Sequence, residues 1–244
     1  MFWNEGSWSW IQKNKIKYPK YWFISELNKP NYPVVGISFY EALAYCRWLC
    51  EKNTEYVFRL PNELQWDYAA HGDEIVFQLK HIRKNIFQSR VWYTNTIEAI
   101  TNLIKRLIGK EEKGSPEQNS SDRIQELVSR LIEYLDKYAD EYKEQLEYNK
   151  LTPVGVFKPY KIGCYDFYGN VWQWCDTWLP ITYPVTDKIP SQTQEKINEP
   201  VIVKGGAWVG SNNHIWLLIG GWFDPYARFQ KIGFRICVTK AKNM

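Results

Sequence analysis

The sequence contains five cysteines and three histidines, side chains that serve as nucleophiles, redox groups and metal ligands: Cys46, Cys50, Cys164, Cys175, Cys237, His71, His81 and His214. Cys46 and Cys50 are one helical turn apart, as two metal ligands on a helix would be. No second cysteine or histidine pair lies nearby in sequence. We therefore favour core packing of these two thiols over metal binding.

Two segments that carry several of these residues are predicted to be helices. The first spans Ser38–Cys50, where Glu41 completes a capping box, and the second spans Asn62–Ala70, where Gln65 does so. Apolar residues recur at helical spacing in the first segment. His71 follows the second segment, and we expect it to bond the last helical carbonyls rather than to act as a catalyst.

The segment Gly163–Trp178 contains six aromatic residues broken by Gly169 and Asn170. Tyrosine and tryptophan can fill a core with their rings while their polar tips bond the backbone. Glycine and asparagine both tolerate positive φ, so this pair predicts a sharp turn between two buried pieces. We expect the segment to form an aromatic core.

Composition restricts the functional class. A net charge of +4 spread over 244 residues gives no basic cluster for nucleic acid. The sequence has neither an apolar run that could span a bilayer nor the pattern of a signal peptide. An odd, sparse set of cysteines favours a reducing compartment. We therefore expect a cytoplasmic protein with no nucleic-acid or membrane partner.

The chain is predicted to be one domain over 1–244 with an inserted αα-hairpin over 95–148. Two apolar stripes at helical spacing, 97–108 and 124–146, flank the polar loop 110–121. The stripes either pack on each other and on the body, or form a docking surface for a partner or a second copy. Elsewhere, 201–208 predicts a strand entering a glycine turn and 234–240 predicts a final strand, whereas 1–31 shows no clean period.

The aromatic block, GCYDFYGNVWQWCDTW, resembles the G-L-Y-D-M-x-G-N-V-W-E-W signature of the formylglycine-generating-enzyme-like (sulfatase-modifying-factor) family. Three further blocks agree in order: YPVVGISFYEALAYCRWL at 32–49, FRLPNELQWDYAAHG at 58–72, and VKGGAW at 203–208 closed by IGFR at 232–235. The resemblance implies an α+β, C-type-lectin-like fold that is rich in loops. The fold alone does not fix the function.

The resemblance also allows a test for catalytic chemistry. The family's oxidases use two copper-binding cysteines, and Gly210 and Ile215 stand at the matching positions. Neither supplies a thiolate for copper, and three dispersed histidines do not match the iron site of the related sulfoxide synthases. The family's calcium site uses an asparagine, present as Asn170, and a glutamate, replaced by Gln173. We therefore expect no catalytic residue, metal or cofactor.

The stretch Val209–Arg235 resembles, in length, the C-terminal block of the variable proteins of diversity-generating retroelements, which share this fold. Pro225 and Arg228 agree with that block, whereas Trp216 and Gly220 replace its usual arginines. The resemblance implies a solvent-facing recognition surface. We assign as ligand-binding the residues at its variable positions: Val209, Ser211, Asn213, His214, Ile219, Trp222, Phe223, Asp224, Ala227, Phe229, Gln230 and Lys231.

We hypothesise a non-catalytic module that binds a protein or peptide through its C-terminal surface, 209–231. The resemblance leaves two forms of this module open, a retroelement-diversified variable protein and an undiversified binding domain. Trp222, Phe223 and Phe229 would be its aromatic anchors, in an apparent loop. One alternative is a formylglycine-generating or sulfoxide-synthase-type oxidase with relocated ligands. Another is a scaffold subunit that docks a partner, or a second copy, through 95–148.

Overall fold

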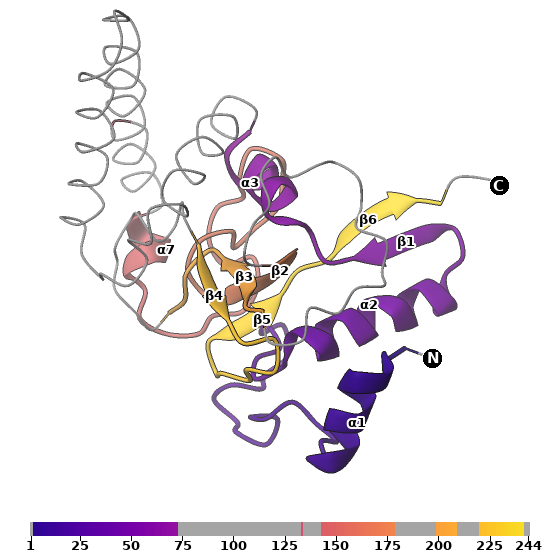
Figure 1. Cartoon of the computed structure of the whole chain (residues 1–244). Helices are drawn as coiled ribbons and strands as arrows, with labels where there is room; N and C mark the ends of the chain where they lie inside the picture. The colour runs from indigo at the N-terminus through magenta and orange to yellow at the C-terminus, as the bar shows by residue number, and fades with distance from the viewer. Residues whose placement is uncertain (1, 73–132, 134–142, 179–198, 209–219, 242–244) are drawn as a thin grey trace, which may run out of the picture.

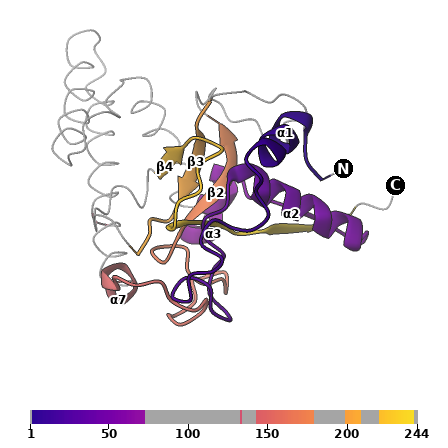
Figure 2. The same ribbon diagram turned by 90° about the horizontal axis from the view of Figure 1, so that it is seen from below.

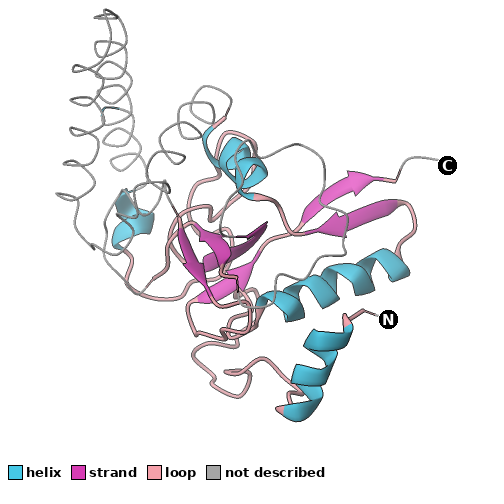
Figure 3. Cartoon of the chain, in the orientation of Figure 1, coloured by secondary structure: helices cyan, strands magenta, loops and turns pink. Residues whose placement is uncertain are grey.

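The computed structural model describes residues 2–72, 133, 143–178, 199–208 and 220–241 (Figure 1). Loops connect most of the helices and strands, as Figure 3 shows, and the strands are short. The elements in chain order are α1 Glu5–Lys13, α2 Phe39–Lys52, β1 Tyr56–Arg59, α3 Glu63–His71, α7 Lys143–Glu147, β2 Trp172–Trp178, β3 Val201–Lys204, β4 Gly221–Phe223, β5 Ile232–Phe234 and β6 Cys237–Lys240. This is the predicted α+β, loop-rich architecture.

The strands form a four-stranded sheet with the order β4-β3-β2-β5 and a two-stranded sheet of β1 and β6. Strand β2 is antiparallel to β3 and parallel to β5, with Trp174 opposite Val203 on one side and Phe234 on the other. Helix α3 lies on one side of the larger sheet and α2 on the other (Figures 1 and 2).

The period-2 alternation of β3 divides the core between the two faces of the larger sheet. Val201 and Val203 pack with Trp174 and α2, whereas Ile202 packs with Trp66 of α3. Successive strand residues point to opposite faces, so the apolar run Val201–Val203 must be covered on both faces. The predicted aromatic core is confirmed, since Trp174 and Phe167 are almost completely buried.

Both predicted capping boxes are confirmed. At the start of α2 the Ser38 amide donates to the Glu41 carboxylate (2.8 Å) and the Glu41 amide donates to the Ser38 hydroxyl (3.2 Å). Asn62 begins α3 in the same way. Cys46 is 2% exposed within the core, as expected for a packing thiol. His71 ends α3 as expected, and its Nε2 lies 2.6 Å from the Tyr168 hydroxyl, a side-chain contact that was not predicted.

Other expectations need correction or extension. The segment without a clean period contains a helix, α1, which begins at the N-cap Asn4. The predicted single strand 234–240 consists of two strands, because β5 joins the larger sheet and β6 pairs with β1. The predicted hairpin 95–148 lies mostly outside the described residues, although Lys143–Glu147 is helical. In the part of the chain that the structure describes, no helix has the length and hydropathy to cross a membrane.

Candidate functional site

The predicted C-terminal surface is described only in part. Between β4 and β5 the exposed residues are Asp224, Phe229 and Gln230, whereas Ala227 and Lys231 are half-buried. The remaining predicted surface residues before β4 lie outside the described residues: Val209, Ser211, Asn213, His214 and Ile219. The described part of the surface is therefore the loop 224–231 and the strand that precedes it.

Trp222 and Phe223 belong to strand β4, not to a loop. They pair with Ile202 and Val201 of β3, and both are half-buried against core clusters. The Phe223 ring meets Trp174 edge-on at 6.4 Å and Phe229 at 5.4 Å. Phe223 therefore packs against Phe229, whereas Trp222 packs with the core cluster that contains Trp66 of α3. Phe229 is the exposed aromatic side chain of the loop 224–231.

The backbone of the loop 224–231 is held by several hydrogen bonds. The Asp224 carboxylate accepts from the Tyr226 amide (2.8 Å), and the Pro225 carbonyl accepts from the Phe39 amide at the start of α2 (3.0 Å). At its end the Lys231 carbonyl accepts from the Trp172 amide (2.9 Å). The exposed side chains are thus presented on a fixed frame.

Arg228 joins this loop to two other parts of the chain. Its Nε lies 2.8 Å from Glu41 Oε2 and its Nη2 donates to Glu41 Oε1 (3.0 Å), so the capping carboxylate of α2 is also an ion-pair partner. Nη2 also donates to the Tyr18 carbonyl (2.5 Å). Such a paired guanidinium fixes geometry better than a single hydrogen bond. Arg228 therefore places the loop 17–24 beside the loop 224–231.

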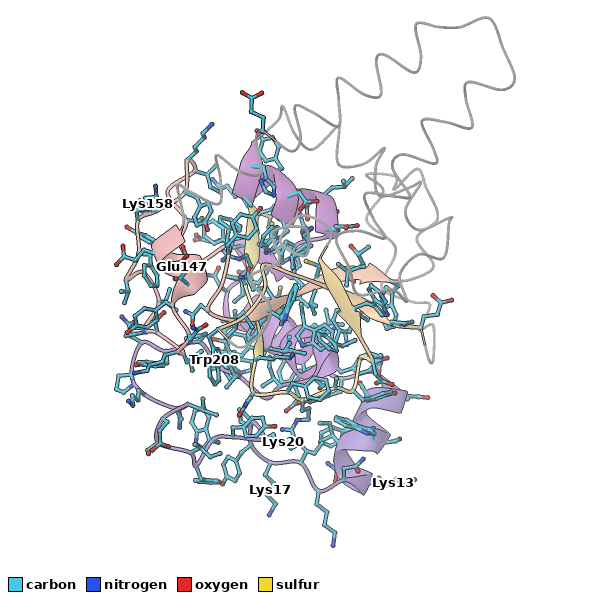
Figure 4. The ribbon with its side chains drawn as sticks, turned by 90° about the vertical axis from the view of Figure 1, so that its left-hand side faces the viewer. Lys13, Lys17, Lys20, Glu147, Lys158 and Trp208 are labelled. Atoms are coloured by element: carbon cyan, nitrogen blue, oxygen red, sulfur yellow. The ribbon has the colours of Figure 1, made fainter. Side chains whose placement is uncertain are left out.

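The loop 17–24 also exposes aromatic residues beside the site, which was not predicted from the sequence. Phe23 is 82% exposed and Tyr18 is 54% exposed, with their rings 5.3 Å apart edge to face. Lys17 and Lys20 project from the same loop (Figure 4). The run KYPKYWFI at 17–24, aromatic and lysine-rich, was the available signal. A cavity of about 10 Å³ beneath it, lined partly by Tyr21 and Leu27, has room for about one water molecule.

A buried polar group lies under α3. Lys204 of β3 pairs with Asp67 of α3 at 3.0 Å, and both side chains are fully buried. The Lys204 ammonium also lies 5.4 Å from the centroid of the Trp66 ring. A buried ion pair of this kind holds the helix in register with the sheet at a cost in desolvation. Its burial and its distance from open solvent indicate a structural role.

Two of the five cysteines are buried thiols with raised pKa values. All five lie among the described residues and are free, and no group of three or more His, Cys, Asp and Glu side chains there could hold a metal ion. Burial, together with the nearby Cys50 and Asp176, raises the pKa of Cys46 to about 12. Burial also raises the pKa of Cys175 well above its ordinary value. Both thiols are therefore protonated near neutral pH and are poor soft ligands.

We expect alkylation to separate these thiols. In the native protein at pH 8, iodoacetamide should modify the exposed Cys164 first, while Cys46 and Cys175 react only after denaturant is added, because the thiolate is the reactive form. Peptide mass spectrometry at timed intervals measures the order. Native Cys46 reacting as fast as Cys164 would contradict the burial described above.

Comparisons with known proteins find relatives of this chain. Two curated relatives are the formylglycine-generating enzyme of Streptomyces coelicolor, 26% identical over 165 residues (64% of this chain, 35% of the relative), and the inactive C-alpha-formylglycine-generating enzyme 2 of Bos taurus, 26% identical over 221 residues (87% and 52%). This chain thus spans about a third to a half of their length. The solved structure of variable protein 1 from Treponema denticola is 18% identical, with a TM-score of 0.45 over 89% of this chain and 74% of that one.

Both proteins named as enzymes and proteins named as inactive thus occur among the relatives. The sequence profile of the sulfatase-modifying factor enzyme 1-like domain matches residues 4–240, almost the whole chain. The four sequence blocks, the α+β fold and this match lead to one conclusion. The chain belongs to the sulfatase-modifying factor enzyme 1-like (formylglycine-generating-enzyme-like) domain family.

Proposed function

We propose that the chain is a non-catalytic binding module whose recognition surface joins the loops 224–231 and 17–24. The observation that carries the proposal is the exposure of aromatic rings on loops with fixed backbones. Phe229 is 44% exposed and Phe23 is 82% exposed, although both loops are bonded to the body of the domain. Large exposed apolar side chains on an ordered frame are typical of interaction sites.

The order of the two loops favours binding, because little conformational entropy remains to be lost. The loop 17–24 is held by internal turns, such as the Trp22 amide donating to the Pro19 carbonyl (3.0 Å) and the Ile24 amide donating to the Tyr21 carbonyl (3.0 Å). Gly36 links the two loops, because its amide donates to the Phe229 carbonyl (3.1 Å) and its carbonyl accepts from the Lys20 amide (2.9 Å). Aromatic side chains add contact area at low entropic cost.

A protein or peptide fits this surface better than a small molecule. The cavity under the loop 17–24 measures about 10 Å³, which is too small to enclose an organic ligand, so this part of the surface suits a partner that lies across it. Lys17 and Lys20 are exposed in the same loop as Tyr18 and Phe23, so a partner with acidic groups around an apolar centre would complement them.

A displayed random-peptide library, panned against the intact chain, tests the proposal. Replacing Phe229 or Phe23 by aspartate should weaken the selected peptides about tenfold or more, because a buried aromatic anchor contributes at least about 1.4 kcal/mol to binding. Val238→Asp is the matched control, since Val238 is 50% exposed on β6, away from both loops.

Thermal midpoints of all three variants should stay close to that of the unmodified chain. Selected peptides that bind both loop variants as tightly as the control variant would contradict the proposed surface. Conversion of a cysteine in a substrate peptide to an aldehyde, in the presence of copper, would contradict the non-catalytic assignment.

A second, finer proposal is that the surface is diversified by a retroelement. It is supported by the different environments of framework and variable positions within the loop 224–231. Pro225 and Arg228, which match the retroelement block, bond the body of the domain, whereas Asp224, Phe229 and Gln230 at its variable positions are exposed. A near-identical downstream repeat differing at adenines, beside a reverse transcriptase gene, would support diversification, and its absence from the locus would contradict it.

A further inference from the structure

Three main-chain carbonyls of the loop 163–171 converge on one side chain. The Gln173 Nε2 atom donates to the carbonyls of Asp166 (2.8 Å), Phe167 (3.3 Å) and Val171 (3.3 Å). The Gln173 side chain is almost completely buried, at 3% exposed. Convergent carbonyl oxygens in a tight loop are the ligands that a hard cation such as Ca²⁺ takes. In this chain the side-chain amide of Gln173 occupies the position between these oxygens.

Arg235 provides a positive charge at the same place. Its Nη2 donates to the carbonyls of Tyr165 and Asp166, both at 2.9 Å. The guanidinium lies flat over Phe167, with Cζ 3.9 Å from the ring centroid. Burial lowers the pKa of Arg235, and nearby groups including Cys164 and Asp166 oppose that effect; arginine nevertheless stays protonated in proteins.

The orientation of the Gln173 amide follows from its other partners. Its Oε1 accepts from Trp66 Nε1 (2.7 Å) and from Arg235 Nε (2.5 Å). Both partners can only donate, so the oxygen must face them and the amino group must face the carbonyls. The donor-only partners of Oε1 therefore fix the orientation of the Gln173 amide. The carbonyls of Asp166, Phe167 and Val171 consequently face its N–H groups.

Two other side chains at this place are hydrogen-bonded within the chain. The Asn170 amide is bonded to Thr152 through both of its atoms, with Oδ1 accepting from the amide and Nδ2 donating to the carbonyl, each at 3.2 Å. Asp166 accepts the Gly155 amide on Oδ2 (2.8 Å), while its Oδ1 has no hydrogen-bond partner among the described residues.

We infer that the Gln173 amide, held in place by the Arg235 guanidinium, takes over the task of the family's calcium ion in organising the loop 163–171. The ion's task is to neutralise inward-pointing carbonyl oxygens, and here N–H donors from two side chains perform it. Calcium would have to displace these donors and sit beside a guanidinium. The fold, and the surface that it supports, is therefore independent of calcium.

The inference predicts that one substitution converts the loop to calcium dependence. Gln173→Glu keeps the oxygen that accepts from Trp66 and Arg235 but turns a second oxygen toward three carbonyls. With EDTA, this repulsion should lower the thermal midpoint of the full chain by about 5 °C or more. Calcium at 1 mM should restore at least half of the loss, whereas the unmodified chain should melt at the same temperature with calcium or EDTA.

Gln145→Glu is the matched control, because Gln145 is also buried, at 3% exposed, and donates to one carbonyl, that of Tyr168. This variant should lose stability without recovering it in calcium. A midpoint of the unmodified chain that rises by several degrees with calcium, and no longer does so after Asp166→Asn, would overturn the inference. An equal calcium response of both glutamate variants would also overturn it. If Gln173→Glu does not fold, the comparison of calcium with EDTA on the unmodified chain decides alone.

Discussion

Replacing Lys204 by alanine is expected to lower the free energy of unfolding by about 3–5 kcal/mol, a large part of the stability of a typical domain. The change leaves Asp67 at a position with no exposure to water and without the ammonium 3.0 Å away. It also removes the cation that lies 5.4 Å from the Trp66 ring. Urea unfolding followed by tryptophan fluorescence measures the loss.

The double variant Lys204→Met with Asp67→Leu separates the ion pair from simple packing. Replacing both charges by apolar groups of similar volume is often neutral or stabilising, so the double variant should recover most of the stability lost by Lys204→Ala. A single alanine change that costs less than about 1 kcal/mol, or a double variant as unstable as the single one, would show that Asp67 carries no buried charge that depends on Lys204.

The elements that sequence analysis predicted are those whose signals are local. The boxes that start α2 and α3 each need two residues three positions apart, and both occur as expected. The turn after β3 is set by the φ values of Gly205 (+96°) and Gly206 (+77°), which only glycine adopts without strain. These parts required no knowledge of the remainder of the chain.

The elements that were missed depend on distant contacts. Helix α1 buries only Ser7 and Ile11, so its apolar stripe is too narrow to stand out in a segment rich in tryptophan. Strand β4 has three residues and exists because β3 pairs with it. A strand this short has no periodicity to read, and its partner lies outside any local window.

The candidate site shows the same division. The resemblance placed Arg228 in the framework, and the structure shows why: it binds Glu41, the residue that caps α2. Its bond to the Tyr18 carbonyl joins residues 210 positions apart, so the contribution of the loop 17–24 to the surface could not be read from local sequence. The two halves of the surface meet only in the folded chain.

Gly205→Ala is the second change for which we expect a large effect. Gly205 has φ +96°, a region where other residues are strained by about 1–3 kcal/mol. An added methyl group would also overlap the carbonyl oxygen of Phe167 and lie 3.0 Å from Gln173 Nε2 and 3.2 Å from Trp66 Cζ2. The oxygen belongs to the backbone and cannot turn away. The substitution should therefore disrupt the hydrogen bonds between Gln173 and the carbonyls of the loop 163–171.

Gly163→Ala is the matched control, because Gly163 has φ +81° but an added methyl group there would meet none of the described atoms within 4 Å. Both variants share the backbone strain, so the difference between their unfolding free energies isolates the overlap. Gly205→Ala should lose about 1–3 kcal/mol more than Gly163→Ala, the usual cost of overfilling a packed site. Equal losses in urea unfolding would mean that the loop yields at Phe167. The carbonyls around Gln173 would then not be rigid enough to require a positive group among them.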